Sequence, residues 1–253
     1  MIKFFRKIRL RLIAEHRFRK YLLSAIGEIA LVVLGILIAL GVNNWNLKRI
    51  DSKKEQQLIA KLITQTTINQ EKVTEEIEFY HYVETTSDSI LAVFKTKNVR
   101  ISQEDVTALL SVLTFDYHLN LDMTILTEAT ENATLTLLDR DELREAIYDF
   151  KNANDLFMQR ETIINEDLQN HFMGYLYEHY NFARYFSGYE YLISEDAEQS
   201  TTEITESLFF KNYIVIRKLY LEELIENIET LRLKLIQLQK LLYEEKNTSS
   251  SNR

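Results

Sequence analysis

Residues 221–242 read LEELIENIETLRLKLIQLQKLL, and this stretch predicts the architecture of the body of the protein. Its apolar residues recur at alternating spacings of three and four, which is the pattern of a helix with one continuous apolar seam. The residues of this seam are Leu221, Leu224, Ile228, Leu231, Leu235, Leu238 and Leu242. Ile225, Ile236 and Leu241 widen it, which favours a bundle of several helices over a two-stranded coil. We expect a coiled-coil-like C-terminal helix over about 207–246 within an elongated helical bundle.

The composition of the 253-residue chain predicts an all-α fold and excludes several kinds of site. The chain holds five glycines and no proline, whereas β-rich folds need both residues in their turns. Three of these glycines also fall within one apolar stretch, residues 22–42. The absence of cysteine excludes disulfides, zinc–thiolate sites and thiolate nucleophiles. We therefore expect few, long helices.

Capping signals mark where two of the earlier helices begin. Ser102 with Asp105, and Asp139 with Glu142, have the spacing of a capping box at a helix N-terminus. The helices expected ahead of the last one cover about 46–96, 102–113, 122–131 and 139–186.

Polar stretches set the limits of the expected bundle, which covers residues 46–246. Residues 187–206 are acidic and rich in Ser and Thr, as is typical of an exposed connection. Residues 247–253 are too polar to fold, so we expect a disordered tail there. The helix from about 140 repeats the seam more loosely. Asn154 occupies one position of that seam, where it either fixes the packing register or faces solvent.

Residues 22–42 read LLSAIGEIALVVLGILIALGV and predict one transmembrane helix. A helix of these 21 residues rises about 31 Å, which matches a hydrocarbon core of roughly 30 Å. Tyr21 and Trp45 flank the run with amphipathic rings of the kind that favour the membrane interface. We expect the transmembrane helix over residues 22–45. The partner expected for this end of the chain is the lipid bilayer, and not nucleic acid.

Two other interpretations of the apolar run stay open. The length of the run and the basic residues before it disfavour a buried core helix. A cleavable signal peptide is supported by Ala39-Leu40-Gly41, which resembles a small-x-small cleavage site. Against a signal peptide, the basic lead is long, and the apolar run exceeds the roughly 7–15 residues of a signal peptide's apolar region. We expect an uncleaved anchor.

Charge divides the chain into a basic end and an acidic body. Residues 1–42 hold eight Lys and Arg against two Glu, whereas the rest holds 22 Lys and Arg against 36 Asp and Glu. Residues 1–21 interleave basic and apolar side chains, which predicts either a basic amphipathic helix on an anionic leaflet or a plain topology signal. Eight Lys and Arg precede the span and five follow within twenty residues. The positive-inside rule therefore leaves residues 1–21 in the cytoplasm and the body outside.

Four residues of the span are candidates for a role in the membrane. Glu28 is a carboxylate in an apolar helix, where such groups serve proton paths, pair with another helix or reach the headgroups. Because Glu28 lies near the basic flank, the interfacial or helix-pairing role is favoured. Gly35 and Ala39 are spaced so that a second helix can approach closely, and Trp45 belongs to the interface.

Residues 21–45, YLLSAIGEIALVVLGILIALGVNNW, resemble the opening of an uncharacterised family of small single-pass membrane proteins of Gram-negative bacteria. After a basic lead and a tyrosine, that family carries the pattern GEI-x-LVV-x-GI-x-IAL-x-x-NNW. The resemblance implies an inner-membrane protein with a helical periplasmic part, and it implies no reaction. The family pattern leads us to expect a glycine turn at residues 131–136. This chain departs from the pattern there, because it reads ENATLT and has no glycine.

No combination of residues points to catalysis, so we expect neither enzymatic activity nor a cofactor. The clustered glycines of a phosphate-binding loop and the HExxH and GxSxG motifs are absent from the sequence. Glu78 with His81, and His171 with Asp167 and Glu178, are incomplete as metal sites.

Binding is therefore expected to define the function. Nine aromatic residues between 172 and 191 either seal one end of the bundle or form a binding surface. We expect a structural or accessory membrane protein that acts through helix–helix contacts with a second copy or another membrane protein. The alternative is a periplasmic four-helix sensor domain, which would signal through a partner because residues 1–21 are too short to hold a signalling domain.

Overall fold

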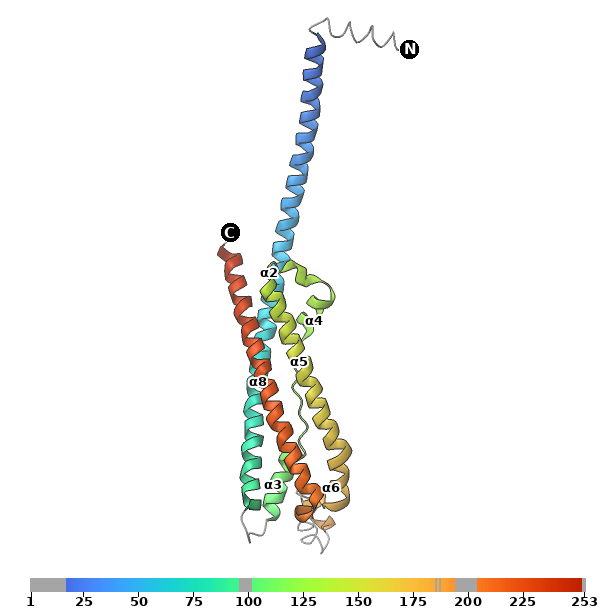
Figure 1. Ribbon diagram of the computed structural model, residues 1–253, viewed down its shortest axis with the longest axis vertical. Coiled ribbons are helices and arrows are strands. Elements are labelled where there is room, and N and C mark those ends of the chain that lie inside the picture. The colour runs from blue at the N-terminus through green and yellow to red at the C-terminus, as the bar shows by residue number, and fades with distance from the viewer. Residues whose placement is uncertain (1–16, 96–101, 185, 187, 194–203, 252–253) are drawn as a thin grey trace, which may run out of the picture. The chain divides into compact units, whose positions relative to one another are not determined.

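The computed structural model describes residues 17–95, 102–184, 186, 188–193 and 204–251, which form helices and connecting segments without a strand (Figure 1). The all-α class expected from the composition is therefore confirmed. The chain divides into two compact units, Met1–Glu55 and Gln56–Arg253. Most of the expected amphipathic lead, residues 1–16, lies outside the described residues, as does the middle of the expected connection, residues 194–203.

Helix α2, Arg17–Lys95, is the longest element of the chain, and it belongs to the first unit as far as Glu55. Neither glycine nor proline occurs between residues 42 and 96, so no residue with a strong helix-breaking preference interrupts it there. Within the second unit, α2 turns a stripe of apolar side chains, including Ile59, Val73 and Val83, into the core.

Three short helices follow α2: α3 (Gln103–Leu113), α4 (Thr124–Glu131) and the 3₁₀ turn η1 (Thr134–Leu137). The capping box expected at α3 is confirmed, because the Asp105 N–H donates to Ser102 Oγ at 3.0 Å and the Ser102 N–H donates to Asp105 Oδ2 at 3.2 Å. Ala133 has a φ of +53°, a left-handed conformation that favours glycine, and it falls where the family resemblance implies a glycine turn.

The prediction of one long helix over residues 139–186 is wrong about where the helix begins and ends. It begins as α5 (Asp141–Asp167), widens into the π-turn η2 (Leu168–Phe172), and ends as α6 (Met173–His179). The buried residues at 168, 172 and 176 repeat every four positions, and the wide turn allows them to stay on the core side. Two 3₁₀ turns, η3 (Phe182–Arg184) and η4 (Glu190–Leu192), follow.

The capping box expected at Asp139 and Glu142 is also wrong. The N-cap residue of α5 is Arg140, and its side chain makes no capping hydrogen bond. The Glu142 carboxylate is occupied elsewhere, because the Arg140 guanidinium donates to it at 2.8 Å. Arg140 also bonds Glu244 at 2.9 Å, so this side chain joins the start of α5 to the C-terminal helix.

Helix α8, Leu208–Ser251, completes the chain and runs beside α5 (Figure 1). Ion pairs follow the contact between the two helices, including Lys234 with Asp149 at 2.7 Å and Arg160 with Glu223. We predicted a disordered tail over residues 247–253. This prediction is wrong for residues 247–251, because α8 continues to Ser251. Once a long helix exists, each added residue gains a backbone hydrogen bond without a new nucleation step. Residues 252–253 lie outside the described residues.

Candidate functional site

Among the residues that the structure describes, α2 is the one helix long and apolar enough to cross a membrane. Between residues 22 and 42 its large apolar side chains are 48% to 73% exposed. No described residue of the same unit, within 17–55, buries this run. A helix that is apolar on all sides is stable only inside a protein or a bilayer, so this run needs a covering surface that the described part of its unit does not supply.

Three of the four candidate residues of the span lie on one face of α2. At about 100° per residue, Glu28, Gly35 and Ala39 fall within about 40° of one another around the helix axis. A methyl group added at Gly35 would have no atom within 4 Å, so this face is open to a second helix. Trp45 lies about 100° away from that face. It is 64% exposed, and the Arg49 guanidinium stands 5.9 Å from its ring centre.

The seven seam residues of α8 are all buried, with exposed fractions of 3% or less. They face core residues of the same chain, which include Phe150 and Phe157 of α5. Asn154, for which the sequence left two alternatives open, is buried and only 3% exposed. The structure places it on the core side rather than in solvent.

Glu161 of α5 is a buried carboxylate that the sequence analysis did not single out. It is 6% exposed and accepts hydrogen bonds from the Leu119 N–H at 2.8 Å and the Tyr80 hydroxyl at 3.3 Å. The spacing of the helix carried a signal for it, because 157, 161 and 164 continue the alternation of four and three along the seam. Any residue at position 161 has to face the core.

Burial makes this carboxylate titrate near neutral pH. Loss of solvation raises the pKa of Glu161 to about 7 from an ordinary value of 4.5, although the Leu119 N–H acts in the opposite direction. Burial likewise raises the pKa of Glu76, which lies nearby on α2. It also raises the pKa values of the Tyr80 and Tyr117 hydroxyls, so both stay protonated.

Side chains of three helices hold the extended segment 115–123, which connects α3 to α4 and lacks a strand partner. Asn165 of α5 accepts from the Tyr117 N–H at 3.0 Å and donates to the Tyr117 carbonyl at 2.8 Å. Asn69 of α2 accepts from the Asp122 N–H at 2.8 Å and donates to the Asp122 carbonyl at 2.7 Å. These two amides replace the hydrogen bonds that a neighbouring strand would otherwise supply.

Arg217 of α8 lies in the same polar interior as Glu161, Asn165 and Asn69. It is 2% exposed, and its guanidinium donates to the carbonyls of Ile164, at 3.1 Å, and of Phe115. It also lies 4.6 Å from the centre of the Tyr117 ring. The cavity beside Tyr117 and Arg217 has only about 10 Å³, which is room for about one water. We conclude that the polar interior ties helices together and is closed to a substrate.

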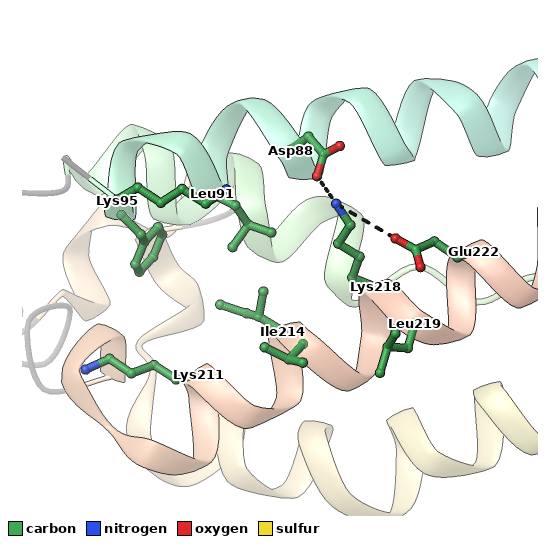
Figure 2. A pocket seen from close by; sticks show the side chains of 10 residues that line it. Asp88, Leu91, Lys95, Lys211, Ile214, Lys218, Leu219 and Glu222 are labelled. Atoms are coloured by element: carbon green, nitrogen blue, oxygen red, sulfur yellow. Dashed lines mark hydrogen bonds and ion pairs between the residues drawn. The ribbon is translucent and has the colours of Figure 1, made fainter.

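A larger pocket of about 540 Å³ lies between the end of α2 and the start of α8 (Figure 2). Five charged side chains line it together with apolar ones. The Lys218 ammonium reaches between Asp88 and Glu222, and it stands 4.0 Å from the Glu222 carboxylate. Lys95 and Lys211 form no ion pair with any described carboxylate, and Lys211 donates to the Glu206 carbonyl at 3.0 Å. Because its two walls come from segments more than a hundred residues apart, no local pattern predicted this pocket.

The aromatic cluster expected to act as one group divides into packed and exposed residues. Phe172 is fully buried and stacks on Tyr213, with ring centres 3.8 Å apart, and Tyr180 is buried as well. Tyr177 and Tyr191 are 70% and 77% exposed. Neither the sealing role nor the binding role therefore fits every described member, and Tyr185 lies outside the described residues.

Within the described residues, no cluster of three or more His, Asp or Glu side chains is suited to a metal ion. His171 pairs with Asp167 at 3.2 Å, and both side chains lie at the surface of the helix. Comparisons with protein-family models, with curated proteins and with solved structures find no match to this chain.

Proposed function

We propose that the protein is a single-pass accessory protein of a bacterial inner membrane whose helical body acts through non-covalent contacts. The observation that supports this most is the exposure of every large apolar side chain between residues 22 and 42. In water this surface would drive aggregation, whereas its length matches a bilayer core. The pattern shared with small inner-membrane proteins of Gram-negative bacteria supports the choice of membrane.

In this proposal residues 1–21 lie in the cytoplasm and the body lies in the periplasm. The support is the distribution of basic residues, eight before the span and five after it. The body is an elongated helical bundle with a coiled-coil-like C-terminal helix. This is supported by the buried seam of α8 and by the ion pairs that link α8 to α5.

Contacts with a second helix are proposed at two places, treated separately because they belong to different units. In the span, Glu28, Gly35 and Ala39 offer one face with two small residues, which favours close helix pairing. On α5, Leu156 and Ile163 are seven residues apart on the outer face, and they are 62% and 42% exposed. Such an exposed apolar line favours a partner helix from a second copy or from another membrane protein.

The second candidate is a sensor domain that binds a small molecule and signals through a partner protein. The pocket of about 540 Å³ favours this candidate, because its volume lies within the roughly 300–1,000 Å³ of small-molecule sites.

Cysteine labelling tests the proposed anchoring and orientation. The chain has no cysteine, so single introduced thiols report their location without background. In spheroplasts, a membrane-impermeant maleimide is expected to label Glu226→Cys, on the exposed side of α8, and to leave Lys3→Cys unlabelled until the membrane is permeabilised. The full-length protein is expected to stay in the membrane after an alkaline carbonate wash.

Other outcomes would contradict separate parts of the proposal. A soluble form that starts near residue 42 would identify a cleaved signal peptide. Labelling of Lys3→Cys with protection of Glu226→Cys would reverse the orientation. Release of full-length protein by carbonate would rule out a membrane span.

A further inference from the structure

The pocket between α2 and α8 combines an apolar interior with an apolar rim. Leu91 and Phe94 come from α2, and Ile214 comes from α8, where it is only 4% exposed. Leu219, which Figure 2 labels, lines the same pocket. Val215 lines it as well, and the two side chains are 54% and 58% exposed. A ligand that covers these two side chains removes apolar surface from water, which favours binding of an apolar chain.

The charges of the pocket specify the head group of such a ligand. Among the described residues, its ionised lining groups are three lysines and two carboxylates, which leaves one net positive charge. Lys218 is paired with both Asp88 and Glu222, and these three groups together carry one net negative charge. The two positive charges that remain for a ligand are those of Lys95 and Lys211. A monoanion would neutralise the site, whereas a dianion would overcompensate it and a cation would be repelled. Lysine stems also pack against an apolar chain while their ammonium groups bind its head.

We propose that this pocket binds a free single-chain amphiphile with a carboxylate head group, of the kind represented by a fatty acid anion. The aliphatic chain contacts the apolar residues between α2 and α8, and the carboxylate binds Lys95 and Lys211. The inference goes beyond the proposed function, because it depends only on residues of the second unit and on neither the orientation nor the partner of the protein.

Calorimetric titration of the full chain tests the proposal. The chain is reconstituted in nanodiscs of zwitterionic phospholipid and titrated with decanoate, and the heat measured with empty nanodiscs is subtracted. One saturable site per chain is expected. Decanol, which has the same chain without the charge, is expected to bind roughly fivefold more weakly, because it loses two exposed charge contacts. Decyltrimethylammonium is expected to show no saturable binding.

Variants of the lining residues locate the site. Lys95→Gln/Lys211→Gln is expected to weaken decanoate binding roughly fivefold, as decanol does. Val215→Asp/Leu219→Asp places two carboxylates beside the ligand and is expected to weaken binding by about tenfold or more. The matched control is Leu233→Asp, at a residue of α8 outside the pocket that is 62% exposed, and it is expected to bind as the wild type does.

Three results would overturn the proposal. Decanoate heats no larger than those of empty nanodiscs would mean that the pocket does not bind this class of ligand. Equal affinities for Val215→Asp/Leu219→Asp and Leu233→Asp would place the ligand elsewhere. Equal affinities for the wild type and the lysine variant would remove the carboxylate from Lys95 and Lys211. If circular dichroism shows that the Asp pair misfolds, the lysine variant decides, because Lys95 and Lys211 are both exposed.

Discussion

At the scale of one residue, the carboxylate of Glu161 couples the stability of the body to pH. Its pKa is raised from 4.5 to about 7 by burial, so between these values the folded chain holds a proton that the unfolded chain has released. The free energy of unfolding therefore falls as the pH rises through this window, and it is highest below it. Glu76, whose pKa is also raised by burial, acts in the same direction.

We predict that Glu161→Gln removes most of this pH dependence. The amide oxygen of Gln still accepts from the Leu119 N–H, but the side chain stays neutral. Between pH 4 and pH 8, the stability of the wild type relative to the variant should fall by on the order of 3 kcal/mol, which urea unfolding at the two pH values measures.

Glu226→Gln is the matched control for this prediction, because Glu226 is exposed on α8. The difference between this control and the wild type should not change with pH. A pH-independent difference between the wild type and Glu161→Gln would show that folding does not shift the pKa of Glu161.

At the scale of elements, the extended segment 115–123 depends on side chains instead of on a strand partner. We predict that Asn165→Leu and Asn69→Leu each destabilise the body by about 2–4 kcal/mol, because each leaves two backbone groups of the segment without a partner. Asn152→Leu, at an exposed position of α5, is the control and should change stability little. Urea unfolding that gives equal values for Asn165→Leu and Asn152→Leu would contradict this role of the amides.

The same segment marks the limit of what the sequence predicts. Apolar spacings of three and four predicted the seam of α8, and Ser102 with Asp105 predicted the start of α3. Both predictions were possible because each signal lies within a few residues of the structure that it specifies. The segment 115–123 has its hydrogen-bond partners on α2 and α5, about fifty residues away in each direction, so no local pattern identifies it. The pocket between α2 and α8 is non-local in the same way.

The seam of α8 is predicted to hold the body together rather than to bind a partner. Leu231→Asp/Leu235→Asp introduces two charges at positions that are fully buried, at a cost beyond ordinary stability. Circular dichroism of residues 46–253 should show loss of helical structure at every protein concentration, whereas the exposed control Leu233→Asp should remain folded. A folded double variant with reduced mass would instead identify the seam as an oligomer interface.

At the scale of the whole molecule, the proposed accessory role requires two chains to meet, and the span offers a face for that contact. Two copies with the same orientation are parallel, so equivalent residues of a symmetric pair face each other. Around the axis of α2, Ala39 lies about 20° from Glu28, on the face that also carries Gly35, and Leu37 lies on the opposite side. The small residues at 35 and 39 allow the two backbones to come close.

We predict that Ala39→Cys forms a disulfide-linked dimer when native membranes are oxidised and that Leu37→Cys does not. A disulfide needs Cα atoms roughly 4.4–6.8 Å apart, so it reports close backbone contact at one face and not mere proximity in the membrane. The chain has no other cysteine, and non-reducing gel electrophoresis therefore reads the result directly. Adding Gly35→Leu to Ala39→Cys should reduce the dimer, because a large side chain separates the helices. Equal cross-linking at 37 and 39 would indicate random collision. Absence of cross-linking at both positions would contradict self-association through the span. Contacts of the helical body would then remain as the basis of the accessory role.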